Sequence, residues 1–266
     1  MHHFHTVALS ALAAALLSFT PLNPAHLKTA SQGVKNVVLV HGASADGSSW
    51  EKVIPMLQAK GLTVISVQNP LTSLADDVAA TKRAIAMLHG PVLLVGHSWA
   101  GVVITEAGND PKVAGLMYLS ALAPDAGQSL SDMAKEGPTA PGPAEYKPDA
   151  SGFLVLSQKG FTEDFAQDLP PLQTKVMYSV QGGWAKQCPD EKVTKAAWKT
   201  RPTWFIVAGE DRMINPDLEK VAAKRMHATT LVLKSSHVSM LSQPKKVADF
   251  IISATEKLSA QQLSKR

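Results

Sequence analysis

Ser98 lies in the stretch 96–101, Gly-His-Ser-Trp-Ala-Gly, between two apolar runs. The run before it, Val92–Val95, is short and β-branched and is typical of a buried parallel strand, whereas the run after it suits a helix. A serine on a tight strand-to-helix turn projects its hydroxyl out of the sheet, with a helix N-terminus beneath the charge that develops there. The pattern Gly-x-Ser-x-Gly is incomplete because Ala100 replaces its last glycine, but alanine is the next smallest side chain. We therefore predict a nucleophilic serine, provided that the rest of the chain supplies its partners.

Those partners are a base that takes the serine proton, an acid that orients the base, and donors for a tetrahedral oxyanion. His237 follows the last predicted strand and Asp211 follows the strand before it. The chain order is thus Ser98, Asp211, His237, with each residue at the carboxyl end of a predicted strand, where open α/β sheets place their sites. We predict that these three form a catalytic triad. Two other acids stay open as alternatives to Asp211: its neighbour Glu210, and Asp125, which follows the strand after Ser98.

The oxyanion donors are expected to be main-chain N–H groups. One is the N–H of Trp99, directly after the serine, and the other is the N–H of Ala43 in the loop after the first strand. Gly42 lets that loop approach the substrate carbonyl closely. The remaining histidines of the folded part are interpreted as structural: His41, His89, His97 and His227.

Strands alternate with helices along most of the chain. We expect strands at residues 34–40, 62–67, 92–95, 113–120, 202–208 and 230–233, and helices at 50–60, 76–88, 216–226 and 244–258, besides the helix after Ser98 that ends near residue 108. This alternation predicts an α/β fold with a mostly parallel sheet of about six strands flanked by helices. Prolines break the rhythm at residues 124–199, which we predict to be a small helical cap. Residues 31–123 and 200–266 then form the two parts of the core.

Composition excludes several classes of protein. The chain has 266 residues, of which 45% are hydrophobic and 18% charged, with a net charge of +4, as in a packed globular protein. Its basic residues form no stripe with interleaved aromatic residues, so nucleic-acid binding is not expected. No metal-binding motif and no glycine-rich nucleotide loop is present, and we predict that no metal and no cofactor is needed. The single cysteine, Cys188, excludes an intrachain disulfide.

Residues 1–30 are interpreted as a signal peptide or leader. The apolar run Val7–Phe19 matches the hydrophobic region of a signal peptide and is shorter than the roughly 20 residues of a membrane span. We therefore expect a periplasmic or secreted protein with no stable membrane span, and an uncleaved anchor is the alternative. The oligomeric state is left open.

Together these stretches resemble the α/β-hydrolase superfamily, and within it the branch that contains plant methylesterases, hydroxynitrile lyases and small bacterial carboxylesterases. The shared stretches are Val38–Ala43 with Trp50, Val95–Ser98, Leu119–Asp125, Gly209–Asp211 and Ser236–Leu241. The resemblance implies an α/β-hydrolase fold, the triad Ser98, Asp211 and His237, and oxyanion donors at Ala43 and Trp99.

Two departures bear on the reaction. Hydroxynitrile lyases of this branch carry a lysine directly after the catalytic histidine, where this chain has Val238, and a hydroxyl-bearing residue at the position of Ala43. Haloalkane dehalogenases need an aspartate where this chain has Ser98. We expect a serine carboxylesterase that cleaves small to medium esters through an acyl-enzyme on Ser98. The alternatives are a lyase or cofactor-free perhydrolase on the same triad, and a non-catalytic ligand-binding homologue.

Overall fold

The computed structural model describes residues 1–2 and 33–264, so the leader predicted at residues 1–30 lies almost entirely outside the described residues. Six parallel strands form the main sheet in the order β2-β1-β3-β4-β8-β9. The strands are β1 (Asn36–Val40), β2 (Thr63–Ser66), β3 (Val92–His97), β4 (Val113–Leu119), β8 (Thr203–Ala208) and β9 (Thr229–Leu233). The predicted α/β architecture is confirmed, with β3 at the centre of the sheet.

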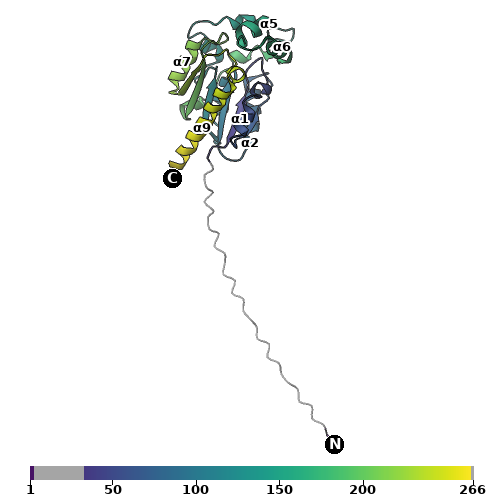
Figure 1. Ribbon diagram of the computed structural model, residues 1–266, viewed down its shortest axis with the longest axis vertical. Helices are drawn as coiled ribbons and strands as arrows, with labels where there is room; N and C mark the ends of the chain where they lie inside the picture. Colours follow the sequence, from purple (N-terminus) through teal and green to yellow (C-terminus); the bar gives the residue numbers. More distant parts are fainter. Residues whose placement is uncertain (3–32, 265–266) are drawn as a thin grey trace. The chain divides into compact units, whose positions relative to one another are not determined.

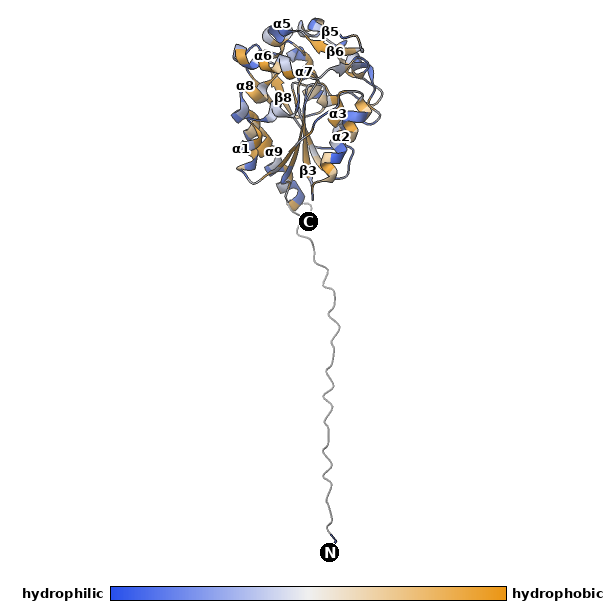
Figure 2. Cartoon of the chain, turned by 90° about the vertical axis from the view of Figure 1, so that its right-hand side faces the viewer, coloured by the Kyte–Doolittle hydropathy of each residue, from blue (hydrophilic) through white to orange (hydrophobic). Residues whose placement is uncertain are grey.

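Helices cover both faces of this sheet (Figure 2). They are α1 (Ile54–Gln58), α2 (Leu74–Ala86), α3 (Ala100–Ala107), α7 (Pro216–Arg225), α8 (Ser239–Ser242) and α9 (Pro244–Ser264). Alternate residues of β3 point to opposite faces: Leu94 packs in the core that includes α2, α3 and α7, whereas Leu93 and Val95 pack in the core that includes α1, α8 and α9. Burial on both faces explains why this strand is apolar throughout.

Some element boundaries differ from those predicted. The helix expected at residues 50–60 is a short 3₁₀ turn, Gly47–Trp50, followed by α1. Pro55 stands in the first turn of α1, where its missing N–H costs nothing, and this favours a helix start there. Helix α2 starts two residues early because the hydroxyl of Ser73 caps it by accepting the N–H of Asp76 at 3.0 Å. None of the helices in the described part is long and apolar enough to cross a membrane.

The segment between β4 and β8, residues 124–199, is called the insertion below. It contains helices α4 (Leu130–Ala134), α5 (Gln158–Gly160) and α6 (Pro171–Val180), and strands β5 (Tyr146–Pro148), β6 (Phe153–Leu156) and β7 (Trp184–Ala185). Besides the expected helices it therefore has a three-stranded antiparallel sheet in the order β5-β6-β7. Helices α5 and α6 lie beyond one end of the main sheet, at the top of Figure 1.

Candidate active site

Ser98 sits on the sharp turn between β3 and α3 with a backbone φ of 54°, in the left-handed region that non-glycine residues rarely adopt. The turn needs small neighbours. A side chain at Gly96 would place its Cβ 2.7 Å from the carbonyl oxygen of Ala100, and one at Gly101 would lie 2.4 Å from the carbonyl oxygen of Leu122. Glycine is thus required at position 101, where α3 meets the loop after β4, and alanine is accommodated at position 100. This accounts for the incomplete Gly-x-Ser-x-Gly pattern.

The loop after β1 lies directly against this turn. A Cβ on Gly42 would be 2.7 Å from the Cβ of Ser98, so only glycine permits the approach. His41 holds the loop in place: its Nε2 accepts the N–H of Asn69 at 2.9 Å, and its Nδ1 donates to the carbonyl of Gly42 at 2.8 Å. Burial lowers the pKa of His41, which keeps the ring neutral, as this pair of contacts requires.

Ala43 and Trp99 both line the cavity that Ser98 faces. Within residues 33–264 no hydrogen bond occupies the backbone N–H of either residue. These are the two N–H groups that the sequence predicts as oxyanion donors, and they are available to a ligand.

His237 and Asp211 form a buried pair. The Nδ1 of His237 lies 2.6 Å from Oδ2 of Asp211, and both side chains are almost fully enclosed. The other carboxylate oxygen of Asp211, Oδ1, accepts the N–H groups of Met213 at 2.7 Å and Ile214 at 2.9 Å. With Nδ1 directed at Asp211, Nε2 is the ring nitrogen that is left to act as a base. His237 lines the same cavity as Ser98.

No hydrogen bond joins the hydroxyl of Ser98 to His237 in this structure, although both residues line the same cavity. His97, predicted as structural, supports the base from behind: its Nε2 donates to the backbone carbonyl of His237 at 3.0 Å. Burial lowers the pKa of His97 well below its usual value, so its ring is neutral and adds no charge beside His237.

The cavity has a volume of about 310 Å³ and is lined by residues of the core and of the insertion. Aromatic and aliphatic side chains dominate, among them Trp99, Leu122, Leu130, Tyr146, Trp184 and Met213. Among residues 33–264, no lysine, arginine, aspartate or glutamate lines it. A cavity of this kind favours an apolar, uncharged ligand, because nothing in it would compensate the desolvation of a charge.

Trp99 is fixed on its far side by a buried carboxylate. Its indole N–H donates to Oδ2 of Asp77 at 2.7 Å, while Oδ1 of Asp77 accepts the N–H of Leu71 at 2.8 Å. Asp77 is 0% exposed, and this burial raises its pKa to about 6. Trp99 also packs on Trp184 of the insertion, with ring centroids 5.4 Å apart, and Trp184 packs on Tyr146 at 5.8 Å. These rings form one wall that joins the core to the insertion.

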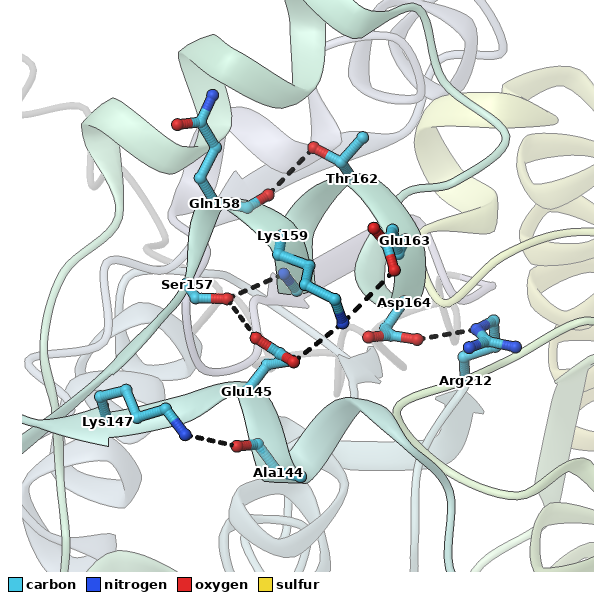
Figure 3. A network of polar contacts seen from close by, with 11 residues as sticks. Ala144, Glu145, Lys147, Ser157, Gln158, Lys159, Thr162, Glu163, Asp164 and Arg212 are labelled. Carbon is cyan, nitrogen blue, oxygen red and sulfur yellow. Dashed lines mark hydrogen bonds and ion pairs between the residues drawn. The ribbon is translucent and has the colours of Figure 1, made fainter.

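The insertion also holds the two loops that carry the acid and the base. Asp164 lies 2.7 Å from Nε of Arg212, the residue after Asp211. Figure 3 shows this pair beside a second group of polar contacts around Lys159. The backbone carbonyl of Arg212 accepts the N–H of Gly142 at 2.8 Å. On the other loop, Asp168 accepts the N–H of Ser236 at 2.9 Å.

Phe165 adds an apolar contact to these tethers, because its ring lies 5.1 Å from that of His237. The segment Phe161–Asp168 of the insertion therefore contacts the loop of Asp211 and the loop of His237 together.

The alternative acids lie elsewhere. Asp125 forms an ion pair with Lys199 at 2.6 Å, and the hydrogen bond from Lys199 lowers its pKa. Glu210 is exposed, and its Oε1 lies 3.7 Å from Nζ of Lys234.

Cys188 is buried, and burial raises the pKa of its thiol to about 12, so it stays protonated. Within the described residues, no group of histidine, cysteine, aspartate and glutamate side chains could hold a metal ion.

Sequence reasoning missed two buried carboxyl groups near the site, Asp77 on α2 and Glu219 on α7. Both are 0% exposed. Each is a charged residue on the apolar face of an amphipathic helix: Asp77 shares the face of Leu74 and Thr81, and Glu219 adjoins Ala222 and Ala223. Such a residue needs a partner, and this pattern could have flagged both.

Comparisons with known proteins agree with the fold described above. Methylesterase 2 of Arabidopsis thaliana is 22% identical over 258 residues, covering 84% of this chain and 96% of that protein. The crystal structure of polyneuridine aldehyde esterase superposes with a TM-score of 0.71 at 18% identity, over 84% of this chain and 99% of that one. The structure of an extracellular alpha/beta-hydrolase from a Paenibacillus species superposes with a TM-score of 0.70 at 19% identity. The match covers 82% of this chain and 98% of that one. The model of the alpha/beta hydrolase family matches residues 37–250. With most of its length matched, the chain belongs to the alpha/beta hydrolase family.

Proposed function

We propose that the protein is a serine carboxylesterase that works through an acyl-enzyme on Ser98. The observation that carries the proposal is the buried pair of His237 and Asp211 at 2.6 Å, because His237 lines the same cavity as Ser98. Esterases among the similar proteins, such as the methylesterase and polyneuridine aldehyde esterase, add support from the family.

In the first half-reaction, Oγ of Ser98 attacks the ester carbonyl carbon and its proton passes to Nε2 of His237. Asp211 keeps the imidazole oriented and stabilises its positive charge. The N–H groups of Ala43 and Trp99 hold the oxyanion of the tetrahedral intermediate. When the intermediate collapses, the bond from carbon to the alcohol oxygen breaks and the alcohol leaves with the proton from His237.

In the second half-reaction a water molecule attacks the acyl-enzyme while His237 takes one of its protons. The acid is released, and the proton returns to Ser98. No group beyond these side chains, the two N–H donors and water is required by these steps.

The lining of the cavity favours esters that are uncharged on both the acyl and the alcohol side. Its volume of about 310 Å³ suits small to medium groups. We therefore expect higher kcat/KM for neutral p-nitrophenyl esters than for matched esters whose acyl chain ends in a carboxylate.

The test is Ser98→Ala assayed on p-nitrophenyl acetate and butyrate. Loss of the hydroxyl should lower kcat by several orders of magnitude while the protein stays folded. Ser131→Ala is the matched control, because Ser131 lines the same cavity without a role in these steps. A fluorophosphonate probe should add one adduct to the wild type and none to Ser98→Ala. Retained esterase activity in Ser98→Ala would refute the proposal.

We also propose export to the periplasm or the exterior, supported by the signal-like run at residues 7–19. Expression of the full chain in a Gram-negative host, followed by fractionation and sequencing of the mature N-terminus, tests this. An intact Met1 on protein found only in the cytoplasm would contradict it.

A further inference from the structure

Glu219 on α7 is completely buried beside Asp211. Its Oε2 accepts the backbone N–H of Ala208 at 3.0 Å, and the carbonyl of Ala208 in turn accepts the N–H of Asp211 at 3.2 Å. One backbone residue at the end of β8 thus anchors both acids. Both side chains are buried, and Oε1 of Glu219 is left without a hydrogen-bond partner among the described residues.

The two carboxyl groups differ in the donors that they receive. Asp211 receives the N–H groups of Met213 and Ile214 and faces Nδ1 of His237. Glu219 receives one N–H, and its buried Oε1 has no donor among the described residues. Two carboxyl groups in contact can form a hydrogen bond only when one of them carries a proton. The proton belongs on the acid with fewer donors, because the other is better stabilised as an anion.

The charges around Glu219 act in the same direction. Burial, followed by the negative charge of Asp211, raises the pKa of Glu219 well above its usual value. The neighbouring cation Lys220 is half-exposed and pairs with Asp217 at 2.9 Å, so it offsets little of this effect. Two charged groups therefore act on Glu219, Asp211 and the solvent-screened Lys220, and His237 lies against Asp211.

We propose that Glu219 is a positioning residue, a neutral carboxylic acid whose Oε1–H donates a hydrogen bond to the carboxylate of Asp211. This inference rests on the proposed function, in which Asp211 orients His237. The added donor fixes the carboxylate so that Oδ2 faces the imidazole. It also draws negative charge away from Oδ2, which sets how strongly Asp211 favours the protonated form of His237.

Two substitutions separate the donor from the bulk of the side chain. In Glu219→Gln the amide can donate to Asp211 and accept from Ala208, so we expect most of the wild-type kcat to remain. In Glu219→Leu the donor is lost at similar volume, and looser orientation of His237 should lower kcat roughly 10- to 100-fold with little change in KM. Lys220→Gln is the control, since it removes a charge from the same helix at an exposed position.

The pH profile of kcat/KM tests whether Glu219 is protonated. The acid limb of this profile is the decrease of kcat/KM at low pH, and it reports protonation of the base, His237, in the free enzyme. A neutral glutamic acid replaced by glutamine leaves the acid limb in place. Loss of the donor in Glu219→Leu leaves more charge on Asp211 and moves the limb to higher pH. If Glu219 were ionised, Glu219→Gln would remove a negative charge and move the limb to lower pH, and the proposal would be wrong.

A measurement without turnover keeps the test decisive if Glu219→Leu does not fold. Infrared difference spectra of wild type minus Glu219→Gln at about pH 8 should contain the carbonyl band of a protonated acid, since Asp77, with a pKa of about 6, is ionised there. Absence of the band overturns the proposal, as does a Glu219→Leu variant with wild-type kcat and pH profile. Failure of the proposed function is a different result, namely activity that survives Ser98→Ala.

Discussion

Replacing Asp77 by asparagine should change how the stability of this protein depends on pH. The pKa of Asp77 is raised from 3.8 to about 6 because the carboxyl group is buried, so the folded protein binds this proton more tightly than the unfolded chain does. The stabilisation from this proton is greatest below pH 3.8, decreases as the pH rises, and is lost above about pH 6. This difference in pKa between the folded and unfolded states corresponds to about 3 kcal/mol in the free energy of unfolding.

The assay is urea unfolding of the wild type and Asp77→Asn, followed by circular dichroism at a series of values between about pH 4 and pH 7. Asparagine does not titrate, so the difference in unfolding free energy, wild type minus variant, should fall by roughly 2 kcal/mol across this interval, the rest of the about 3 kcal/mol being already lost at pH 4. The amide can accept from Trp99 or from the N–H of Leu71 but not from both. This constant penalty affects the difference equally at every pH and leaves its slope unchanged.

A difference that stays flat would show that Asp77 has an ordinary pKa in the folded protein. A difference that rises with pH would show that the two N–H donors outweigh the cost of burying the charge. Either result refutes the reasoning from burial. Asp76→Asn, on the exposed side of the same helix, is a comparison of opposite sign: hydrogen bonds from Thr72 and Ser73 lower the pKa of Asp76, so its difference should not fall as the pH rises.

Three further substitutions test other parts of the site. Gly42→Ala places a Cβ 2.7 Å from that of Ser98 and should displace the oxyanion loop. We expect kcat to fall about 100-fold while circular dichroism shows a folded protein. An unchanged kcat would show that the loop does not pack as tightly against Ser98 as described. Arg212→Ala leaves the 2%-exposed side chain of Asp164 without its cation and should cost about 1–3 kcal/mol in urea unfolding, whereas an unchanged midpoint would show that the ion pair is dispensable. Trp184→Ala removes one ring of the aromatic wall and enlarges the cavity. Among p-nitrophenyl esters, those with longer acyl chains should then have the highest kcat/KM. An unaltered chain-length preference would show that the acyl group does not bind against Trp184.

Hydrophobic patterning was sufficient to predict all six strands of the main sheet. The reason is that the strands are short and mostly apolar, and that helices follow most of them. The insertion was harder, because β6 pairs with Trp184–Ala185, about 30 residues later in the chain. No local pattern around Phe153 distinguishes that pairing from a short buried helix. Its antiparallel sheet therefore appeared only in the structure.

The site shows a similar division. That Ser98 and His237 line one cavity could be predicted, because the ends of parallel strands meet at one edge of a sheet. The choice between Asp211 and Asp125 could not be made from position, since both follow strands at that edge; the structure pairs Asp211 with His237 and Asp125 with Lys199. That Glu219 and Asp211 are both anchored at Ala208 depends on where α7 packs, which periodicity does not reveal.

The contacts of the segment Phe161–Asp168 have a consequence for how this protein can evolve. The same insertion lines the cavity and holds the loops of Asp211 and His237, through Arg212, Ser236 and Phe165. Selection for a new substrate would act first on the cavity-lining part of the insertion, but large changes there also disturb the alignment of acid and base. Specificity and turnover are therefore inherited together. Divergence in substrate range can proceed without loss of rate only where residues 161–168 are retained while the lining around them varies.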